Sequence, residues 1–149
     1  KDGRVLIQTN ATGQRAIRLC TKHDYKTFYN LEIGDRLRTL FPPFAVFVRA
    51  QFACADENAA ADAAERFANG VTKTILTALK PANAENELVF ALAGAAPIRR
   101  REGLFRHAVI IKLVRTANTA AAINAIYAFS DGCADECYRG IEVNPQDML

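Results

Sequence analysis

The order of hydrophobic and polar positions divides most of the chain into short elements of two periods. Apolar residues that alternate with polar ones predict strands, and apolar residues that recur every three or four positions predict helices. The expected strands are residues 45–54, 87–94, 105–115 and 137–144, and the expected helices are residues 57–80 and 118–130. From residue 45 onward the predicted order is therefore β-α-β-β-α-β.

This order predicts the fold class. It is the order of the split βαβ or ferredoxin-like α+β fold, in which four antiparallel strands carry both helices on one face. The side chains expected to form the core between these layers are Val46, Val48, Ala50, Phe52, Ala64, Phe67, Ala68, Val71, Ile75, Leu79, Val109, Ile111 and Leu113. The other face of the sheet lacks helical cover. By alternation it should carry Arg49, Gln51, Arg106, Ile110, Lys112, Tyr138 and Glu142.

Residues 1–44 are expected to form a separate segment before the C-terminal domain of residues 45–149. Residues 4–9 have the pattern of a short buried strand, and residues 14–40 have a helical period with one break. Gly13 is expected to break the chain before the first helix, and Thr21 or Asp24 to cap a second helix after the break. Pro42 and Pro43 are expected to end the helical segment.

The chain opens without Met and inside a strand-like pattern, so we expect it to be a fragment of a longer protein. A strand cut from its sheet has unpaired, apolar edges. Residues 4–9 are therefore expected to pair with another copy or with the domain's own sheet edge, giving self-association that depends on where the chain is cut. A strictly monomeric mass at all concentrations would contradict this expectation.

The composition of the chain excludes several classes of protein. The chain has 149 residues, half of them apolar, and a formal net charge of +3, so it is not uniformly basic. Its hydrophobic runs are too short to span a membrane. The four cysteines, Cys20, Cys54, Cys133 and Cys137, do not suggest a disulfide framework, although Cys133 and Cys137 are spaced closely enough for a disulfide or a metal. This cysteine pattern favours a reduced, cytosolic protein.

The strongest local charge is the run of Arg99, Arg100 and Arg101, which we place in the connection between the second and third strands. Arg106 follows at the start of the third strand, with Phe105 beside it. Guanidinium groups match phosphate geometry and also stack on bases. The run therefore predicts either a phosphate-binding site or a solvated hairpin that keeps the sheet soluble. Base stacking on Phe47 and Tyr138 of the open face is a further possibility, less favoured than a face covered by another part of the protein.

Catalytic motifs are missing from the sequence. It has no Gly-rich phosphate loop, no G-x-S-x-G and no H-E-x-x-H, and His107 has no evident Cys or Ser partner. We therefore assign no catalytic residues and no metal ligands to this chain.

Five stretches share the motifs of one known family. They are "GRVLIQT" at residues 3–9, "DYKTFYNLEIGDR" at 24–36, "FPPF" at 41–44, "GAAPIRRREGLFRHAVIIK" at 94–112 and "IEVNPQDML" at 141–149. They resemble the C-terminal region of the bacterial primosomal protein N-prime (PriA) family of replication restart helicases. Asn144 departs from the family's usual Asp, and residues 115–122 do not align cleanly with it.

The resemblance implies a role in a larger machine. The parent would be an ATP-dependent 3′-to-5′ DNA helicase that acts at stalled forks in the bacterial cytoplasm, at the nucleoid. Residues 1–44 would hold the last strand of a helicase lobe and a connecting helical segment. The ferredoxin-like domain would bind forked or single-stranded DNA, the single-stranded-DNA-binding protein, other primosome proteins and its own helicase lobes. ATP with Mg²⁺ and the structural zinc would belong to upstream regions, so no cofactor is expected here.

Together with this resemblance, the basic residues predict a DNA-binding surface. Arg99, Arg100, Arg101 and Arg106, with Arg49 and Lys112 in second rank, are expected to contact the phosphate backbone. Two rival classes remain. A small-molecule-sensing βαββαβ regulatory module would need a Gly-rich turn after the first strand, where this chain has "ACADENAA". A purely structural docking domain would have no DNA affinity of its own.

Overall fold

The computed structural model describes residues 3–79 and 87–146 of the chain. Within it the chain divides into two compact units, Lys1–Thr39 and Leu40–Leu149, which we describe separately. The predicted helix end at residue 80 and the predicted tail at residues 147–149 lie outside the described residues. No helix in the described ranges is both long enough and apolar enough to cross a membrane.

The first unit contains two helices, α1 (Arg15–Cys20) and α2 (Tyr25–Thr39). The break between them was predicted, and Asp24 caps α2 by accepting a hydrogen bond from the backbone N of Thr27 at 3.1 Å. Asp35 on α2 forms ion pairs with Arg15 of α1 and with Arg38. Both pairs lower the pKa of Asp35 below its ordinary value, and the pair with Arg15 has the larger effect.

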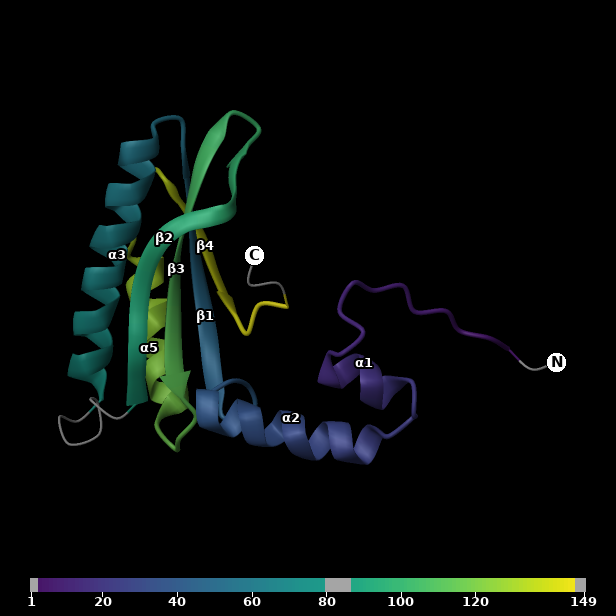
Figure 1. Ribbon diagram of the computed structural model, residues 1–149. Helices are drawn as coiled ribbons and strands as arrows, with labels where there is room; N and C mark the ends of the chain where they lie inside the picture. Colours follow the sequence, from purple (N-terminus) through teal and green to yellow (C-terminus); the bar gives the residue numbers. More distant parts are fainter. Residues whose placement is uncertain (1–2, 80–86, 147–149) are drawn as a thin grey trace. The chain divides into compact units, whose positions relative to one another are not determined.

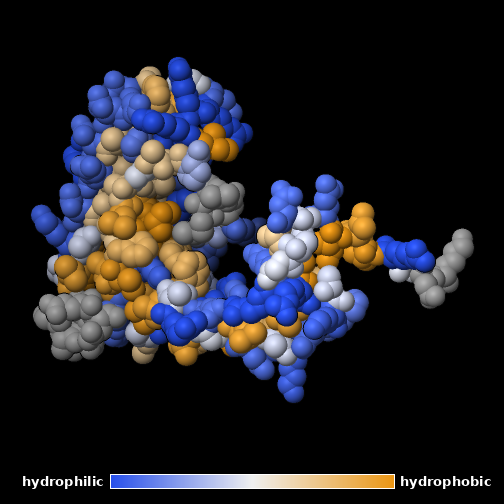
Figure 2. All heavy atoms as spheres, in the orientation of Figure 1, coloured by the Kyte–Doolittle hydropathy of each residue, from blue (hydrophilic) through white to orange (hydrophobic). Residues whose placement is uncertain are grey.

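This first unit has little core of its own. Neither helix contains a buried residue, and Tyr25 and Leu37 are largely exposed. The predicted strand at residues 4–9 is wrong for this chain: the segment has no strand structure, and Val5 and Leu6 are more than nine-tenths exposed. Figure 2 shows a run of hydrophobic side chains, in orange, close to the N-terminal end of the chain. A buried strand needs a partner strand, and none of the described residues provides one.

The second unit has the predicted βαββαβ fold (Figure 1). Its elements are β1 (Ala45–Cys54), α3 (Glu57–Ala78), β2 (Leu88–Arg101), β3 (Leu104–Val114), α5 (Thr119–Asp131) and β4 (Tyr138–Val143). The four strands are antiparallel in the order β2-β3-β1-β4. Both helices lie on one face of this sheet, as expected for a ferredoxin-like fold.

The core lies between the sheet and the helices and matches the prediction closely. Asp56 caps α3 by accepting a hydrogen bond from the backbone N of Ala59 at 2.8 Å. Below that cap, the predicted α3 stripe is buried throughout, and so are the inward residues of β1 and β3. The largest fully buried side chains are Phe52, Ile75, Ile111, Leu113, Ile126, Val48, Val71 and Val109.

Tyr138 does not lie on the open face as predicted. Its ring stacks on Phe67 of α3, with centroids 5.6 Å apart, and its hydroxyl contacts Ser130. The cause is a register shift in the β1–β4 pairing between Gln51 and Phe52, next to Gly140 with its φ of +123°. A shift of one residue moves a side chain to the opposite face of a sheet. Burial raises the pKa of Tyr138.

Candidate nucleic-acid interface

The three consecutive arginines form one side of a β-hairpin, a correction to their predicted place in a connecting loop. Strand β2 continues through Arg101, and Arg101 and Arg100 pair with Leu104 and Phe105 of β3. The turn is only Glu102–Gly103, with φ values of +53° and +81°. Two positive φ values match the twist of a two-residue hairpin, and Gly supplies the second without steric cost. We call residues 98–106 the arginine hairpin.

Each of the three arginines has a defined neighbour. The Nε of Arg99 donates to Glu57, the first residue of α3, at 2.6 Å. The guanidinium of Arg100 lies over the Phe105 ring, 5.0 Å from its centroid. The Nε of Arg101 is 3.3 Å from the carboxylate of Glu102. These contacts hold the guanidinium groups at one end of the domain, where Figure 2 shows a concentration of hydrophilic side chains.

These ion pairs leave the arginines available to another anion. The side chains of Arg99 and Arg101 are both 67% exposed. Surface ion pairs of this kind contribute about 0–1 kcal/mol, so a phosphate group can replace either carboxylate at little cost. Glu57 was not singled out in the sequence, since it lies 42 residues before Arg99.

The remaining predicted contacts differ in accessibility. Arg106 is half-buried on the open face, opposite Ala53 of β1. It lines a shallow pocket of about 20 Å³ together with Arg49 and Gln51. The guanidinium of Arg49 donates to Glu142 of β4 at 2.8 Å, and its side chain is only 14% exposed. Arg106 is therefore better placed than Arg49 for an external phosphate.

Lys112 is buried in an aromatic cage. Its Nζ lies 5.0, 5.4 and 5.7 Å from the ring centroids of Phe41, Phe47 and Phe90. Cation–π attraction of this kind strengthens when the cation is removed from water. The cage also occupies the part of the open face where Phe47 was considered for base stacking. Of the residues predicted to contact phosphate, Arg99, Arg100 and Arg101 are thus exposed, whereas Arg49 and Arg106 are partly buried and Lys112 is buried.

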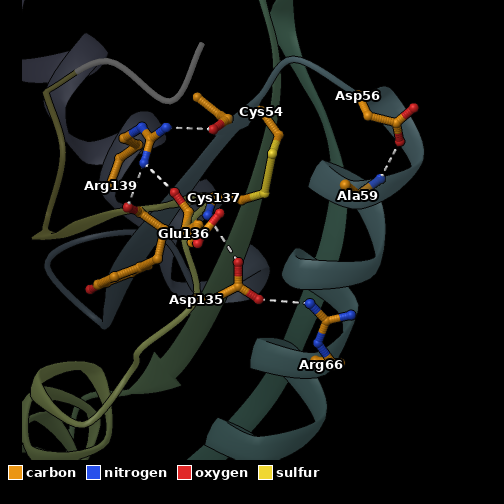
Figure 3. The surroundings of a disulfide bond; sticks show 10 residues. Cys54, Asp56, Ala59, Arg66, Asp135, Glu136, Cys137 and Arg139 are labelled. Atoms are coloured by element: carbon orange, nitrogen blue, oxygen red, sulfur yellow. Dashed lines mark hydrogen bonds and ion pairs between the residues drawn. A yellow bond between two sulfur atoms is a disulfide. The ribbon is translucent and has the colours of Figure 1, made fainter.

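A disulfide joins Cys54 and Cys137 at the same end of the domain (Figure 3). The sequence did not suggest a disulfide framework and left only a Cys133–Cys137 bridge open; the structure instead pairs Cys137 with Cys54. Cys54 ends β1 and Cys137 immediately precedes β4, and the backbone N of Ala53 donates to the carbonyl of Cys137 at 2.7 Å. Cys20 and Cys133 are free thiols. The described residues contain no cluster of three or more His, Cys, Asp or Glu that could hold a metal.

Asp135 supports the segment that carries Cys137. It accepts hydrogen bonds from Arg66 of α3 at 2.6 Å and from the backbone N of Cys137 at 2.9 Å (Figure 3). Both hydrogen bonds lower the pKa of Asp135 below its ordinary value, and the one from Arg66 has the larger effect.

The depressed pKa of Asp135 predicts a pH-dependent loss of stability. The stabilisation is present above the pKa of about 3.9 that an unfolded Asp has, and it is lost as the pH falls through the lower folded value. Asp135→Asn should therefore lower the free energy of unfolding at pH 7, and the difference from wild type should shrink below about pH 4. Urea denaturation across this pH range measures it, with the exposed Asp62→Asn as control. A difference that stays constant down to about pH 2 would contradict the assignment.

Fold and site together define a ferredoxin-like α+β domain with a basic hairpin at one end of its sheet. No protein-family model matches the chain. The sequence is 27% identical over 126 residues to the replication restart protein PriA of Bacillus subtilis (strain 168). The match covers 85% of this chain but 14% of that relative, so the chain corresponds to a small part of it. The chain is thus distantly similar to a protein of replication restart.

Proposed function

We propose that this chain is the C-terminal region of a PriA-like replication restart helicase and binds the phosphate backbone of forked or single-stranded DNA through its arginine hairpin. The observation that carries the proposal is the exposure of three consecutive arginines, Arg99, Arg100 and Arg101, next to the two-residue turn of a β-hairpin. A protein that acts at forks of any sequence needs contacts that do not read bases.

The hairpin can bind in two ways at once. Its guanidinium groups can pair with phosphates, and Arg100 on Phe105 forms a flat surface against which an unpaired base can stack. Single-stranded segments next to a fork junction offer both kinds of group. In this proposal the chain works in the bacterial cytoplasm at the nucleoid, beside the single-stranded-DNA-binding protein and other primosome proteins. ATP, Mg²⁺ and zinc would be bound by other parts of the parent helicase.

The experiment that tests this function is a titration of the chain against fluorescently labelled forked and single-stranded DNA at two salt concentrations. Contacts to phosphates release counterions, so binding should be measurable at low salt and much weaker at high salt. Arg106→Ala should weaken binding more than Arg49→Ala, because Glu142 already pairs with Arg49. The absence of binding at high protein concentration would instead favour a structural docking domain for the helicase lobes.

A further inference from the structure

The Cys54–Cys137 disulfide is linked to the arginine hairpin through cross-strand pairs of the sheet. Cys54 pairs across β1 and β3 with Phe105, and Phe105 pairs across β3 and β2 with Arg100. The ring of Phe105 is also the surface on which Arg100 rests. A continuous row therefore runs from Cys137 through Cys54 and Phe105 to Arg100.

A second connection starts from the same cysteine. Glu57, which pairs with Arg99, is the first residue of α3 and follows Cys54 after a two-residue link. The position of Cys54 thus influences both the platform beneath Arg100 and the partner of Arg99. Two of the three consecutive arginines, Arg99 and Arg100, are therefore held through the strand end that the disulfide fixes.

The disulfide is accessible, and other bonds would hold the fold together without it. Cys54 is half-buried, whereas Cys137 is only 5% exposed, so an external thiol meets Cys54 first. Arg139 donates to the carbonyls of Glu136 at 2.7 Å, Tyr138 at 3.0 Å and Ala53 at 2.7 Å, which keeps the start of β4 near the end of β1. Figure 3 shows Arg139 and the disulfide on the same stretch of chain. Reduction would loosen this end of the sheet and leave the core in place.

We infer that Cys54–Cys137 is a redox switch that sets how firmly the arginine hairpin is ordered, and through it the affinity for DNA. Its effect on DNA rests on the proposed function; its effect on the hairpin does not. Disulfides in a reducing compartment are usually transient or redox-sensing rather than structural. In the oxidised chain the hairpin is preorganised for phosphate, and in the reduced chain part of the binding energy is lost in ordering it.

The switch runs on glutathione-class thiols. The thiolate of one such molecule attacks Sγ of Cys54, the bond to Cys137 breaks, and Cys137 leaves as a thiolate that takes up a proton. A second thiolate attacks the mixed disulfide, which releases Cys54 as a thiol and the small-molecule disulfide. Two electrons pass from the two small thiols to the two cysteines. The reverse exchange restores the bridge.

Hydrogen exchange of the wild-type chain, oxidised and reduced under native conditions, tests the inference without requiring DNA. Amides of residues 99–106 should exchange about ten-fold faster in the reduced form, while those of the α3 core stay protected. The control is Cys20→Ser with Cys133→Ser, which keeps the bridge and should respond to reduction like the wild type. Equal exchange in both forms, or cysteines 54 and 137 that remain thiols across glutathione buffers, would overturn the switch.

DNA affinity measured on the same two forms separates this inference from the proposed function. Reduction should weaken binding about three- to ten-fold at constant salt. Faster hairpin exchange together with no DNA binding in either form would support the switch while contradicting the proposed function. Redox-dependent exchange with equal DNA affinity in both forms would overturn the claim that the switch controls binding.

Discussion

Replacing Cys54 and Cys137 together by serine should lower the free energy of unfolding of the sheet domain by about 4 kcal/mol under oxidising conditions. The two cysteines are 83 residues apart in sequence, so the bridge closes a loop that includes most of the domain. Closing such a loop removes conformational entropy from the unfolded chain, and longer loops give larger effects. Urea denaturation of the oxidised chain and of the double-serine variant measures the difference.

The matched control is Cys20→Ser with Cys133→Ser, since both of these are free thiols. It should unfold at nearly the same urea concentration as the wild type. A double-serine variant at positions 54 and 137 that is as stable as this control would mean that the bridge does not form in solution.

The second large effect is expected in the core of strand β3. Ile111 is completely buried against the helices, whereas its neighbour Ile110 lies half-exposed on the open face. Ile111→Ala should cost about 3–4 kcal/mol, because truncation leaves a cavity that the packed layers cannot fill.

Ile110→Ala is the matched control for this change, since it removes the same atoms from the same strand. It should cost less than about 1 kcal/mol. Similar losses for the two variants would mean that the open face is covered, and that the one-sided packing of helices on the sheet is wrong.

Much of the fold could be predicted because the hydrophobic pattern and the packing agree. The apolar stripe that runs from Ala64 along α3 to Leu79, the residue after the helix, has a helical period and is buried in the structure. Val109, Ile111 and Leu113 recur at every second position of β3 and are buried on the face that the helices cover. Such elements are fixed mainly by the need to bury one face, which the sequence displays directly.

The wrong predictions have local causes that cannot be recognised from the hydrophobic pattern. Strand β2 was predicted to end at residue 94 because Gly94 and the small residues and proline that follow it have the composition of a turn, and three arginines come next. The pair Glu102–Gly103 was the available turn signal, since Gly suits the second position of a two-residue hairpin. Tyr138 was assigned to the wrong face because a register shift cannot be seen in the spacing of side chains.

The candidate site was only partly visible in the sequence. The arginine cluster and Phe105 are adjacent in the chain, so their association could be predicted. Glu57, Glu142 and the aromatic cage of Lys112 come from distant segments, and only the folded sheet brings them together. The same holds for Cys54 and Cys137, because a disulfide depends on the distance between the two Cα atoms, here 5.1 Å.

The most direct test of DNA binding by the arginine hairpin is the slope of log affinity against log salt concentration for labelled fork DNA. Each phosphate contact contributes roughly 0.7–0.9 of a unit to that slope. Replacing Arg99, Arg100 and Arg101 by alanine should therefore reduce the slope by about 2–3 units, and replacement by lysine should leave it nearly unchanged because the charge is kept. An alanine variant with the wild-type slope would show that the arginines do not touch phosphate and that the hairpin is only a solvated turn.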